Sequence, residues 1–301
     1  RESARAEMFE EKIINAIENL EPIKSPKVVI DNSNNTKEGI ITIADAHFGR
    51  SDTVYGLNGE IINDYNEDIF YQRMWELQRQ AIQIIQKENL TKVNIFILGD
   101  LLEGMNRKSV LQSLEYGVTE ATIKVSEFMA NWISKLSEHV KVEVFNNASN
   151  HCEIRPLGSK NGEFDKESFD YIIVFYIKMR LESNSNVIVH DVQNINYVDI
   201  LGTKVSSVHG HNDKNLDNSI KDYCLFYNVR IDILLGAHFH SGASKVIGSN
   251  EFGNIEWIQS PSICSTDGYA QKLKKSCKAG SKMLIIEEGK GKTITYDIKL
   301  S

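Results

Sequence analysis

Side chains that can bind a metal follow an apolar run early in this sequence. Asp45 and His47 come directly after the β-branched run at 41–43, and Gly49 then lets the chain turn. Alternate residues of a strand lie on one face, so the carboxylate and the imidazole point the same way if strand geometry continues through them. One such pair arises often by chance, and on its own it favours a simple turn capped by Asp45.

The same design occurs four more times along the chain. Apolar runs lead into Gly99-Asp100, Asn150-His151, His209-Gly210-His211 and His238-Phe239-His240. Six of the eight histidines lie in these five stretches, which random scatter would not produce. Each motif taken alone favours an ordinary turn or a structural histidine, whereas the ordered set of five favours one shared metal site.

The candidate ligands combine carboxylate, imidazole and neutral amide oxygen. They are Asp45, His47, Asp100, Asn150, His209, His238 and His240. Without a thiolate, this mixture suits borderline divalent cations such as Mn²⁺, Fe²⁺ or Zn²⁺. The set is too large for one ion and fits two ions roughly 3.5–4 Å apart, with Asp100 between them. Such a centre activates water and neutralises phosphate oxygens, which is the chemistry of phosphoester hydrolysis.

The elements that must position these ligands alternate between strands and helices in the first part of the chain. Hydrophobic periodicity predicts strands at 93–98, 140–145, 187–189, 197–200, 204–208 and 231–235. It predicts helices at 67–88, at 108–138 with a break near Gly117, from Asp165 onward, and at 216–227. The tail is rich in strands, at 243–247, 255–258, 283–287 and 293–298. We therefore expect an α/β fold with two packed sheets and helices outside.

The N-terminal stretch is expected to be distinct from the main domain. Residues 7–20 have helical spacing, and a polar stretch with two prolines follows, so 1–39 form a helix and linker while 40–301 form the domain. Because the sequence begins with Arg1, the helix is interpreted either as the end of an upstream domain or as a helix packed on the main domain.

The composition of the chain limits the classes of function that we expect for it. A chain with 41% hydrophobic and 25% charged residues is typical of soluble proteins. The net charge of −7 argues against a protein that coats long stretches of nucleic acid. No apolar run approaches membrane-spanning length and no signal peptide is visible, so no membrane partner is expected. Four cysteines without CxxC spacing predict reduced thiols and a cytoplasmic location.

The five motifs together resemble those of the calcineurin-like metallophosphoesterase superfamily. The match runs in order from about residue 40 to residue 242, and its style is similar to phage- and prophage-encoded members described as DNA repair exonucleases. The resemblance implies a four-layer α/β/β/α sandwich of two mixed sheets flanked by helices, with the metals at the strand ends.

The resemblance also implies a role for each residue of the motifs. One metal would take Asp45, His47, Asp100 and His240, and the other would take Asp100, Asn150, His209 and His238. His151 corresponds to the superfamily's non-ligand histidine, which stabilises charge on the scissile phosphate or protonates the leaving oxygen. His211 matches a common but less essential position, so the choice of His209 over it rests on the resemblance.

Small departures from the superfamily pattern surround these residues. Ser149 and Ala237 stand where glycine is usual, and Cys152 stands where an acidic residue is usual, which affects the expected support of His151 but no ligand. Arg155, in the glycine-containing loop that follows, is predicted to bind the substrate phosphate. The plainer interpretation of Arg155 is an exposed, solubilising side chain.

The expected function is a phosphodiesterase with two divalent ions, Mn²⁺ first and Fe²⁺ or Zn²⁺ as alternatives. The polar loops at 51–66 and 153–164 could wall an open cleft, so we expect a nuclease acting on single-stranded or end-exposed DNA. One alternative is a small-nucleotide phosphodiesterase or phosphatase with the same metals, and another is a non-catalytic binding protein with a vestigial site. A nucleic acid or nucleotide substrate and a second copy in a homodimer are the expected partners.

Overall fold

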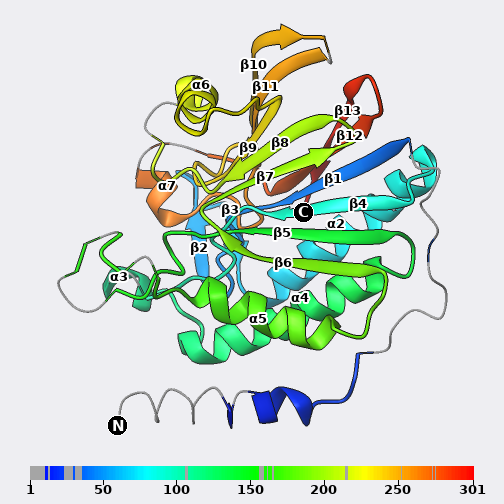
Figure 1. The fold of residues 1–301 in the computed structure, drawn as a ribbon. Helices are drawn as coiled ribbons and strands as arrows, with labels where there is room; N and C mark the ends of the chain where they lie inside the picture. Colours follow the sequence, from blue (N-terminus) through cyan, green and yellow to red (C-terminus); the bar gives the residue numbers. More distant parts are fainter. Residues whose placement is uncertain are drawn as a thin grey trace.

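Two β-sheets lie face to face in the computed structural model (Figure 1). The strand orders are β13-β12-β1-β4-β5-β6 in the larger sheet and β10-β11-β9-β8-β7 in the smaller one. The residues that the structure describes are 11–12, 14–23, 30, 36–105, 108–155, 159–160, 162–164, 166–213, 216–251, 253–272, 274 and 276–301.

The larger sheet is mixed. It contains β1 (Lys37–Ile43), β4 (Lys92–Ile97), β5 (Lys141–Asn147), β6 (Val187–Gln193), β12 (Gly280–Glu287) and β13 (Gly291–Lys299). Strands β1, β4, β5 and β6 run parallel, and β12 and β13 are antiparallel to their neighbours.

The smaller sheet is mixed as well. It contains β7 (Ile195–Ile200), β8 (Thr203–Val208), β9 (Ile233–Gly236), β10 (Ala243–Asn250) and β11 (Gly253–Gln259). Strands β8, β9 and β11 are parallel, while β7 and β10 are antiparallel edge strands.

The helices flank the two sheets. They are α2 (Glu67–Glu88), α3 (Lys108–Leu111), α4 (Val118–Leu136), α5 (Phe169–Leu181), α6 (Leu216–Tyr227) and α7 (Gly268–Lys272). The longest, α2, begins where the Asn66 side chain accepts a hydrogen bond from the Ile69 N–H, and it ends at Asn89 in the left-handed conformation. Among the described helices, none combines the length and the apolar character that a bilayer crossing requires.

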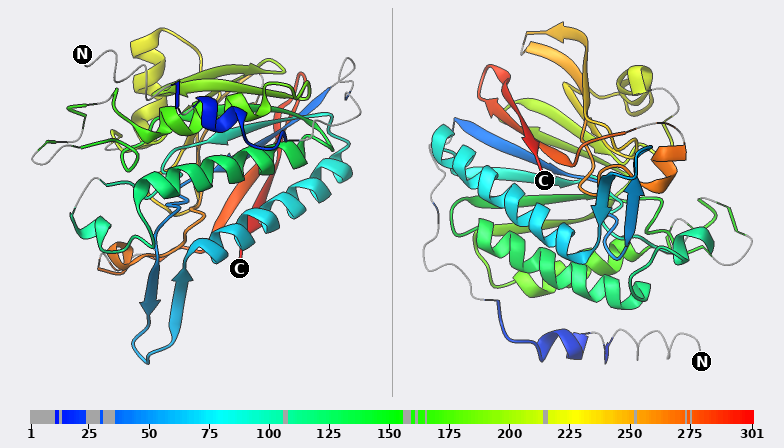
Figure 2. Two further views of the ribbon diagram at one scale, coloured as in Figure 1. Left: turned by 90° about the horizontal axis from the view of Figure 1, so that it is seen from below. Right: turned by 180° about the vertical axis from the view of Figure 1, so that it is seen from behind.

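Three buried clusters hold four layers together. The first packs α2, α4 and α5 on the larger sheet and includes Met74, Trp132 and Ile177. The second lies between the sheets and joins Phe96 to Leu235, among others. The third packs α6 on the outer face of the smaller sheet. The predicted α/β/β/α sandwich of two mixed sheets is therefore confirmed, and Figure 2 shows the three helices on the far side of the larger sheet from α6.

Most predicted elements are present, with shifted ends. The helices at 67–88 and 216–227 have the expected bounds, and the helical stretch at 108–138 is split into α3 and α4 around Gly117. The helix expected from Asp165 begins at Phe169, and the strands expected at 187–189 and 197–200 are longer. The short helix α7 was not predicted.

The prediction that residues 51–66 form a loop was wrong. They form a β-hairpin of β2 (Asp52–Tyr55) and β3 (Ile61–Tyr65) that projects from the body, as Figure 2 shows. Val54, Asn63 and Tyr65 are buried at its base while its tip residues are exposed. The reason is a turn with Gly59 at φ +82°, flanked by stretches that alternate in burial.

The N-terminal residues that are described touch the main body. Residues 14–18 are helical, and Ile23 packs against the first buried cluster. The Arg180 guanidinium donates a hydrogen bond of 2.9 Å to the carbonyl oxygen of Glu21. The division into 1–39 and 40–301 stays a prediction.

Candidate metal centre

The predicted ligands come from the carboxyl ends of five strands. Asp45 follows β1, Asp100 follows β4, Asn150 follows β5, His209 follows β8 and His238 follows β9. Parallel strands place their carboxyl ends at one edge of a sheet. In this fold the two sheets bring both sets of ends together, because the His238 N–H donates to Asp45 Oδ2 at 3.0 Å.

The backbone at this edge is unusual. Asp45, His47, Asp100, His238 and His240 all have positive φ, between 47° and 71°, a region that side chains other than glycine rarely enter. The condition under which strand geometry would carry Asp45 and His47 to one face is therefore not met, since β1 ends at Ile43. Their side chains converge through local strain instead, which is typical of functional sites.

Backbone hydrogen bonds stabilise these strained residues. The Asp45 N–H donates to the carbonyl oxygen of Gly99 at 3.2 Å, and the His47 N–H donates to that of Asp100 at 2.9 Å. Gly99 itself has φ +96°, and a Cβ there would lie 2.7 Å from Ser149 Cβ and 2.8 Å from His209 Nδ1. Only glycine lets the segment after β4, Gly99-Asp100, come this close to Ser149 and His209.

The first group of donors forms around His47 and His240. Their Nε2 atoms face each other at 3.3 Å. The far nitrogen of His47, Nδ1, lies 2.7 Å from Glu103 Oε2, so its proton belongs on that side. The far nitrogen of His240 lies 3.8 Å from Cys264 Sγ. The two Nε2 atoms can therefore share either a proton or a metal cation.

Asp45 adds an unsatisfied oxygen to this group. The residue is fully buried, and its Oδ1 has no hydrogen-bond partner among the described residues while lying 4.0 Å from His240 Nε2. A buried carboxylate oxygen without a partner costs on the order of 1–3 kcal/mol or more. A divalent cation beside His47 and His240 would satisfy it, so the donors present fit such an ion.

The second group of donors forms around His209. Its Nδ1 donates to the carbonyl oxygen of Leu98 at 2.8 Å, which directs Nε2 inward. That Nε2 lies 2.9 Å from Asn150 Oδ1 and 3.1 Å from Asp100 Oδ2, and His238 belongs to the same group of close donors. Nε2 of His209 and these two oxygens can share either a proton or a metal cation, as the first group can.

Asp100 is close to one histidine of the first group of donors, His47, and to both histidines of the second group. It is grouped with His47 and His151 on one side and with His209 and His238 on the other. Burial raises the pKa of Asp100, but the surrounding histidines, His209 first, outweigh burial and hold it well below its usual value. Conversely, burial lowers the pKa of His209, and Asp100 more than compensates and raises it to about 9. Asp100 therefore lies where a bridging carboxylate would lie.

His211 and His238 behave as neutral imidazoles. Burial, followed by the charge of His209, lowers the pKa of both to about 4. A neutral imidazole is the form that binds a metal. His211 lies near His209, with ring centroids 5.4 Å apart, but it is absent from every described group of close donors. The geometry thus agrees with choosing His209 rather than His211.

His151 lies at the open side of the site. Its N–H donates to Asp100 Oδ1 at 2.8 Å and its Nδ1 lies 3.0 Å from Glu103 Oε1. Its side chain is 25% exposed, whereas those of His47 and His209 are at most 1% exposed. A substrate that approaches from solvent would therefore meet His151 before it meets the deeper donors.

Glu103 belongs to the motif that begins at Gly99-Asp100, but the sequence analysis assigned it no role. One oxygen contacts His47 and the other contacts His151, while Arg50 lies 3.8 Å away and also pairs with Asp52. Burial raises the pKa of Glu103, but the two histidines outweigh this effect and lower it strongly. Its place three residues after Asp100 was the available signal.

Neighbouring residues hold the Asn150-His151 loop in place. Asp170 accepts hydrogen bonds from both the N–H and the hydroxyl of Ser149, at 2.9 Å each. Burial raises the pKa of Asp170 to about 6. A Cβ on Gly104 would lie 1.8 Å from the His151 carbonyl oxygen, so only glycine fits where this loop passes. Ser149 thus supports the loop although the superfamily usually has glycine there.

Arg155 is not an exposed, solubilising side chain. It is 10% exposed, its Nε donates to Glu153 Oε2 at 2.8 Å, and its Nη2 donates to the Asn150 carbonyl oxygen at 3.0 Å. These contacts brace the loop that carries Asn150. Its predicted contact with a substrate phosphate stays a prediction.

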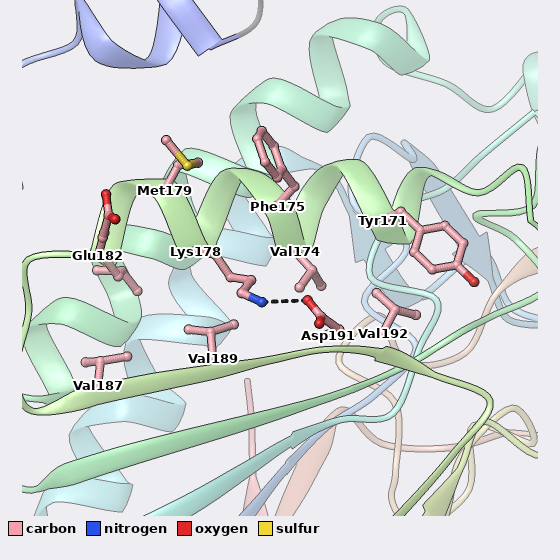
Figure 3. Close-up of a pocket in the computed structure, with 11 residues that line it drawn as sticks. Tyr171, Val174, Phe175, Lys178, Met179, Glu182, Val187, Val189, Asp191 and Val192 are labelled. Carbon is pink, nitrogen blue, oxygen red and sulfur yellow. Dashed lines mark hydrogen bonds and ion pairs between the residues drawn. The ribbon is translucent and has the colours of Figure 1, made fainter. Parts of the chain in front are cut away.

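A separate groove lies away from these residues. It has a volume of about 800 Å³ and runs between α5 and the edge strand β6. Figure 3 shows valines and aromatic rings along it, with one ion pair between Lys178 and Asp191 at 2.5 Å. It contains none of the predicted site residues, so the chemistry is expected at the strand ends.

The sequence is similar to that of a known prophage-derived protein. The sequence is 33% identical over 306 aligned positions to the SPbeta prophage-derived uncharacterized protein YonJ of Bacillus subtilis, in an alignment that covers this whole chain and 74% of that protein. No family model matches the sequence.

Solved structures with a related arrangement are more distant. An archaeal phosphodiesterase is 15% identical with a TM-score of 0.39, covering 88% of this chain and 99% of its own. The zinc complex of Vps29 from Entamoeba histolytica is 12% identical with a TM-score of 0.37, covering 86% and 98%. At these scores we draw no conclusion about this chain from either protein.

Proposed function

We propose that this chain, which belongs to the family of the SPbeta prophage-derived protein YonJ, is a metal-dependent phosphodiesterase that cleaves DNA at single-stranded segments or exposed ends. The observation that carries the proposal is the position of Asp100 between two groups of buried donors. Each group presents histidine Nε2 atoms to other electron-rich atoms at 2.9–3.3 Å. Two divalent cations would satisfy both groups at once.

The residues divide between two cation positions. Asp45, His47, Asp100 and His240 would hold one ion, and Asp100, Asn150, His209 and His238 would hold the other. We expect Mn²⁺, with Fe²⁺ and Zn²⁺ as alternatives, because imidazole and oxygen donors suit all three. When bound, the ions lower the pKa of a coordinated water and neutralise phosphate oxygens in the transition state.

His151 would act on the substrate directly. Glu103 engages its Nδ1, so Nε2 is the atom available to the phosphate, where it stabilises charge or delivers a proton to the leaving oxygen. The same carboxylate contacts His47, so the orientation of the catalytic imidazole and that of a ligand depend on one buried group. Arg50 partly balances the charge of that group.

An exposed aromatic residue favours a substrate with a nucleobase. Phe239 lies between the two ligands His238 and His240 and is 40% exposed, with its ring edge against His238 at a centroid distance of 5.3 Å. Bases stack on such rings without sequence preference. A net charge of −7 disfavours long contacts with duplex phosphates, so recognition is local, at single strands or ends.

A nucleotide-sized substrate is the second candidate, because one stacking ring serves a mononucleotide diester equally well. The close approach of His47 to His240 and of Asp100 to His209 and His238 supports a metal-binding enzyme over a vestigial binding protein. The deciding experiment assays Mn²⁺-loaded protein on bis-p-nitrophenyl phosphate, p-nitrophenyl phosphate, a cyclic or linear dinucleotide, single-stranded DNA and duplex DNA.

We expect diester and single-stranded DNA cleavage with little monoesterase activity, and no activity in Asp100→Asn. Hydrolysis of phosphomonoesters or dinucleotides with intact DNA at matched enzyme and metal concentrations would refute the nuclease proposal. Absence of hydrolysis of every substrate by protein that carries two ions would refute the enzymatic proposal.

A further inference from the structure

Cys264 lies against the first group of donors, far in sequence from every predicted ligand except His238 and His240. It is 1% exposed, and its N–H donates to the Asp45 carbonyl oxygen at 3.2 Å. Its own carbonyl oxygen accepts hydrogen bonds of 3.0 Å from Asn63 Nδ2 and Arg73 Nη1. The backbone of this cysteine is thus fixed on three sides, and the thiol has a defined place.

The sulfur contacts one nitrogen of His240. Cys264 Sγ is 3.8 Å from His240 Nδ1, and it is 3.4 Å from the carbonyl oxygen of Ser265, which can only accept. A thiol has one proton. If that proton goes to Ser265, the sulfur lone pairs remain to accept the Nδ1–H of His240.

The tautomer of His240 follows from this chain of hydrogen bonds. A proton on Nδ1 leaves the lone pair on Nε2, which faces His47 Nε2 at 3.3 Å. Glu103 does the same for His47 from the other side. The two histidines of this group would then both present lone pairs to one point, which is what a cation there requires.

We propose that Cys264 is a positioning residue that fixes the tautomer and the ring orientation of His240. The inference rests on the proposed function only in taking His240 as a metal ligand. Metal-binding histidines usually donate their second N–H to a carboxylate, a carbonyl or water, and here a thiol takes that place. The thiol is a weaker hydrogen-bond acceptor than the carboxylate beside His47. His240 is therefore held less firmly than His47 and is the more easily perturbed ligand of the two.

Direct ligation by the sulfur is the alternative. Cys264, His47 and His240 all have donor atoms within 4.8 Å of one another. However, the sulfur lies 3.8 Å from Nδ1 of His240, whereas the other ring nitrogen, Nε2, is the one that faces His47. A sulfur in that place contacts the ligand rather than the ion.

The test compares Cys264→Ala, Cys264→Ser and Cys277→Ser in the full chain. Cys277 is a matched control, because its sulfur contacts Ser262 Oγ at 3.7 Å and not His240. Metal affinity is measured by calorimetry with Zn²⁺, and the tautomer of each histidine is read from ¹⁵N–¹H spectra of the Zn²⁺-loaded protein. Neither measurement needs substrate, so a protein that binds metal but cleaves nothing would refute the proposed function and leave this inference standing.

We expect Cys264→Ala to weaken the affinity of one metal position about 10- to 100-fold, in line with other groups that support a ligand. In Cys264→Ala, the ¹⁵N–¹H spectra should show one histidine that is no longer purely in the Nδ1–H tautomer. Cys264→Ser should recover most of the metal affinity, and Cys277→Ser should match the unchanged protein. Affinity within twofold and an unchanged tautomer in Cys264→Ala would overturn the inference.

Cobalt provides a measurement that does not depend on any variant folding. The unchanged protein loaded with Co²⁺ should lack the near-ultraviolet charge-transfer band of a sulfur-bound cobalt ion. A strong band at full occupancy that persists in Cys277→Ser would mean that Cys264 is itself a ligand, and the positioning role would be wrong.

Discussion

Replacing Glu103 by glutamine removes a charge that serves two histidines at once. Its carboxylate lies 2.7 Å from His47 Nδ1 and 3.0 Å from His151 Nδ1, and its side chain is 3% exposed. Glutamine keeps the shape but has one acceptor oxygen and one NH₂ group. Whichever way the amide turns, one Nδ1–H would face a donor.

The expected effect follows from that mismatch. An unsatisfied buried donor costs about 1–3 kcal/mol, which corresponds to roughly 5- to 150-fold in an equilibrium constant. If the amide oxygen stays on His151, the loss appears in metal affinity through His47. If it stays on His47, the loss appears in the turnover number at saturating metal. The product of the loss in metal affinity and the loss in turnover should therefore be about 5- to 150-fold in either case.

The assay measures Mn²⁺ affinity by calorimetry and turnover of bis-p-nitrophenyl phosphate at saturating metal. Glu143→Gln is the matched control, because Glu143 contacts His190 Nε2 at 2.7 Å and Lys92 Nζ at 2.8 Å with no contact to the predicted ligands. We expect the control to keep both properties. A Glu103→Gln protein within twofold of the original in both would refute the orientation argument.

The remaining predictions address the other groups of the site. Asp100→Asn should lose both ions by elemental analysis, because it removes the bridging carboxylate; full occupancy would contradict that assignment. His151→Gln should keep its metal content but lose turnover by roughly two to four powers of ten, whereas loss of metal would make His151 a ligand. Because the pKa of His209 is raised to about 9, a metal must displace its proton below that pH. Calorimetry should therefore show metal affinity rising about tenfold per pH unit up to about pH 9 and levelling above, and a flat profile would argue against it. The raised pKa of His209 also predicts that the free energy of unfolding of the metal-free protein falls between about pH 6.5 and about pH 9. The charged imidazole contributes fully to stability below pH 6.5, and this contribution is lost as the proton leaves. Phe239→Ala should raise KM for single-stranded DNA by about 5- to 150-fold, from loss of about 1–3 kcal/mol of stacking, with little change for the more exposed control Phe226→Ala, and equal effects in both would exclude base stacking on Phe239.

The strand-end motifs made the fold and the donor types predictable from sequence. A run of β-branched residues followed by Asp, His or Asn is visible without a structure, and so is the periodicity of α2. Two sheets with helices outside follow from the order of those elements, and the structure confirms them. In a stretch with strong hydrophobic periodicity, the pattern itself shows where the helix begins and ends. The helices predicted at 67–88 and 216–227 therefore have the observed bounds.

Features that depend on distant contacts were not predictable. Glu103 acquires its role from histidines at positions 47 and 151, and its place three residues after Asp100 was the local signal for it. Cys264 acquires its role from position 240, and no local pattern distinguishes it from an ordinary residue. The left-handed backbone at Asp45 and His47 is accompanied by hydrogen bonds to the carbonyl oxygens of Gly99 and Asp100, which lie more than 50 residues away in the sequence. The DNA substrate, the role of Arg155 and a homodimer stay predictions because they concern contacts outside the chain.

The central claim is that this edge of the sheets holds two divalent cations that share Asp100. Anomalous X-ray scattering from crystals of the Mn²⁺-loaded protein tests it most directly, with data collected on both sides of the manganese edge. The account predicts two anomalous peaks, one beside His47 and His240 and the other beside His209 and His238, with Asp100 contacting both. A single peak, or none at full manganese saturation, would contradict it.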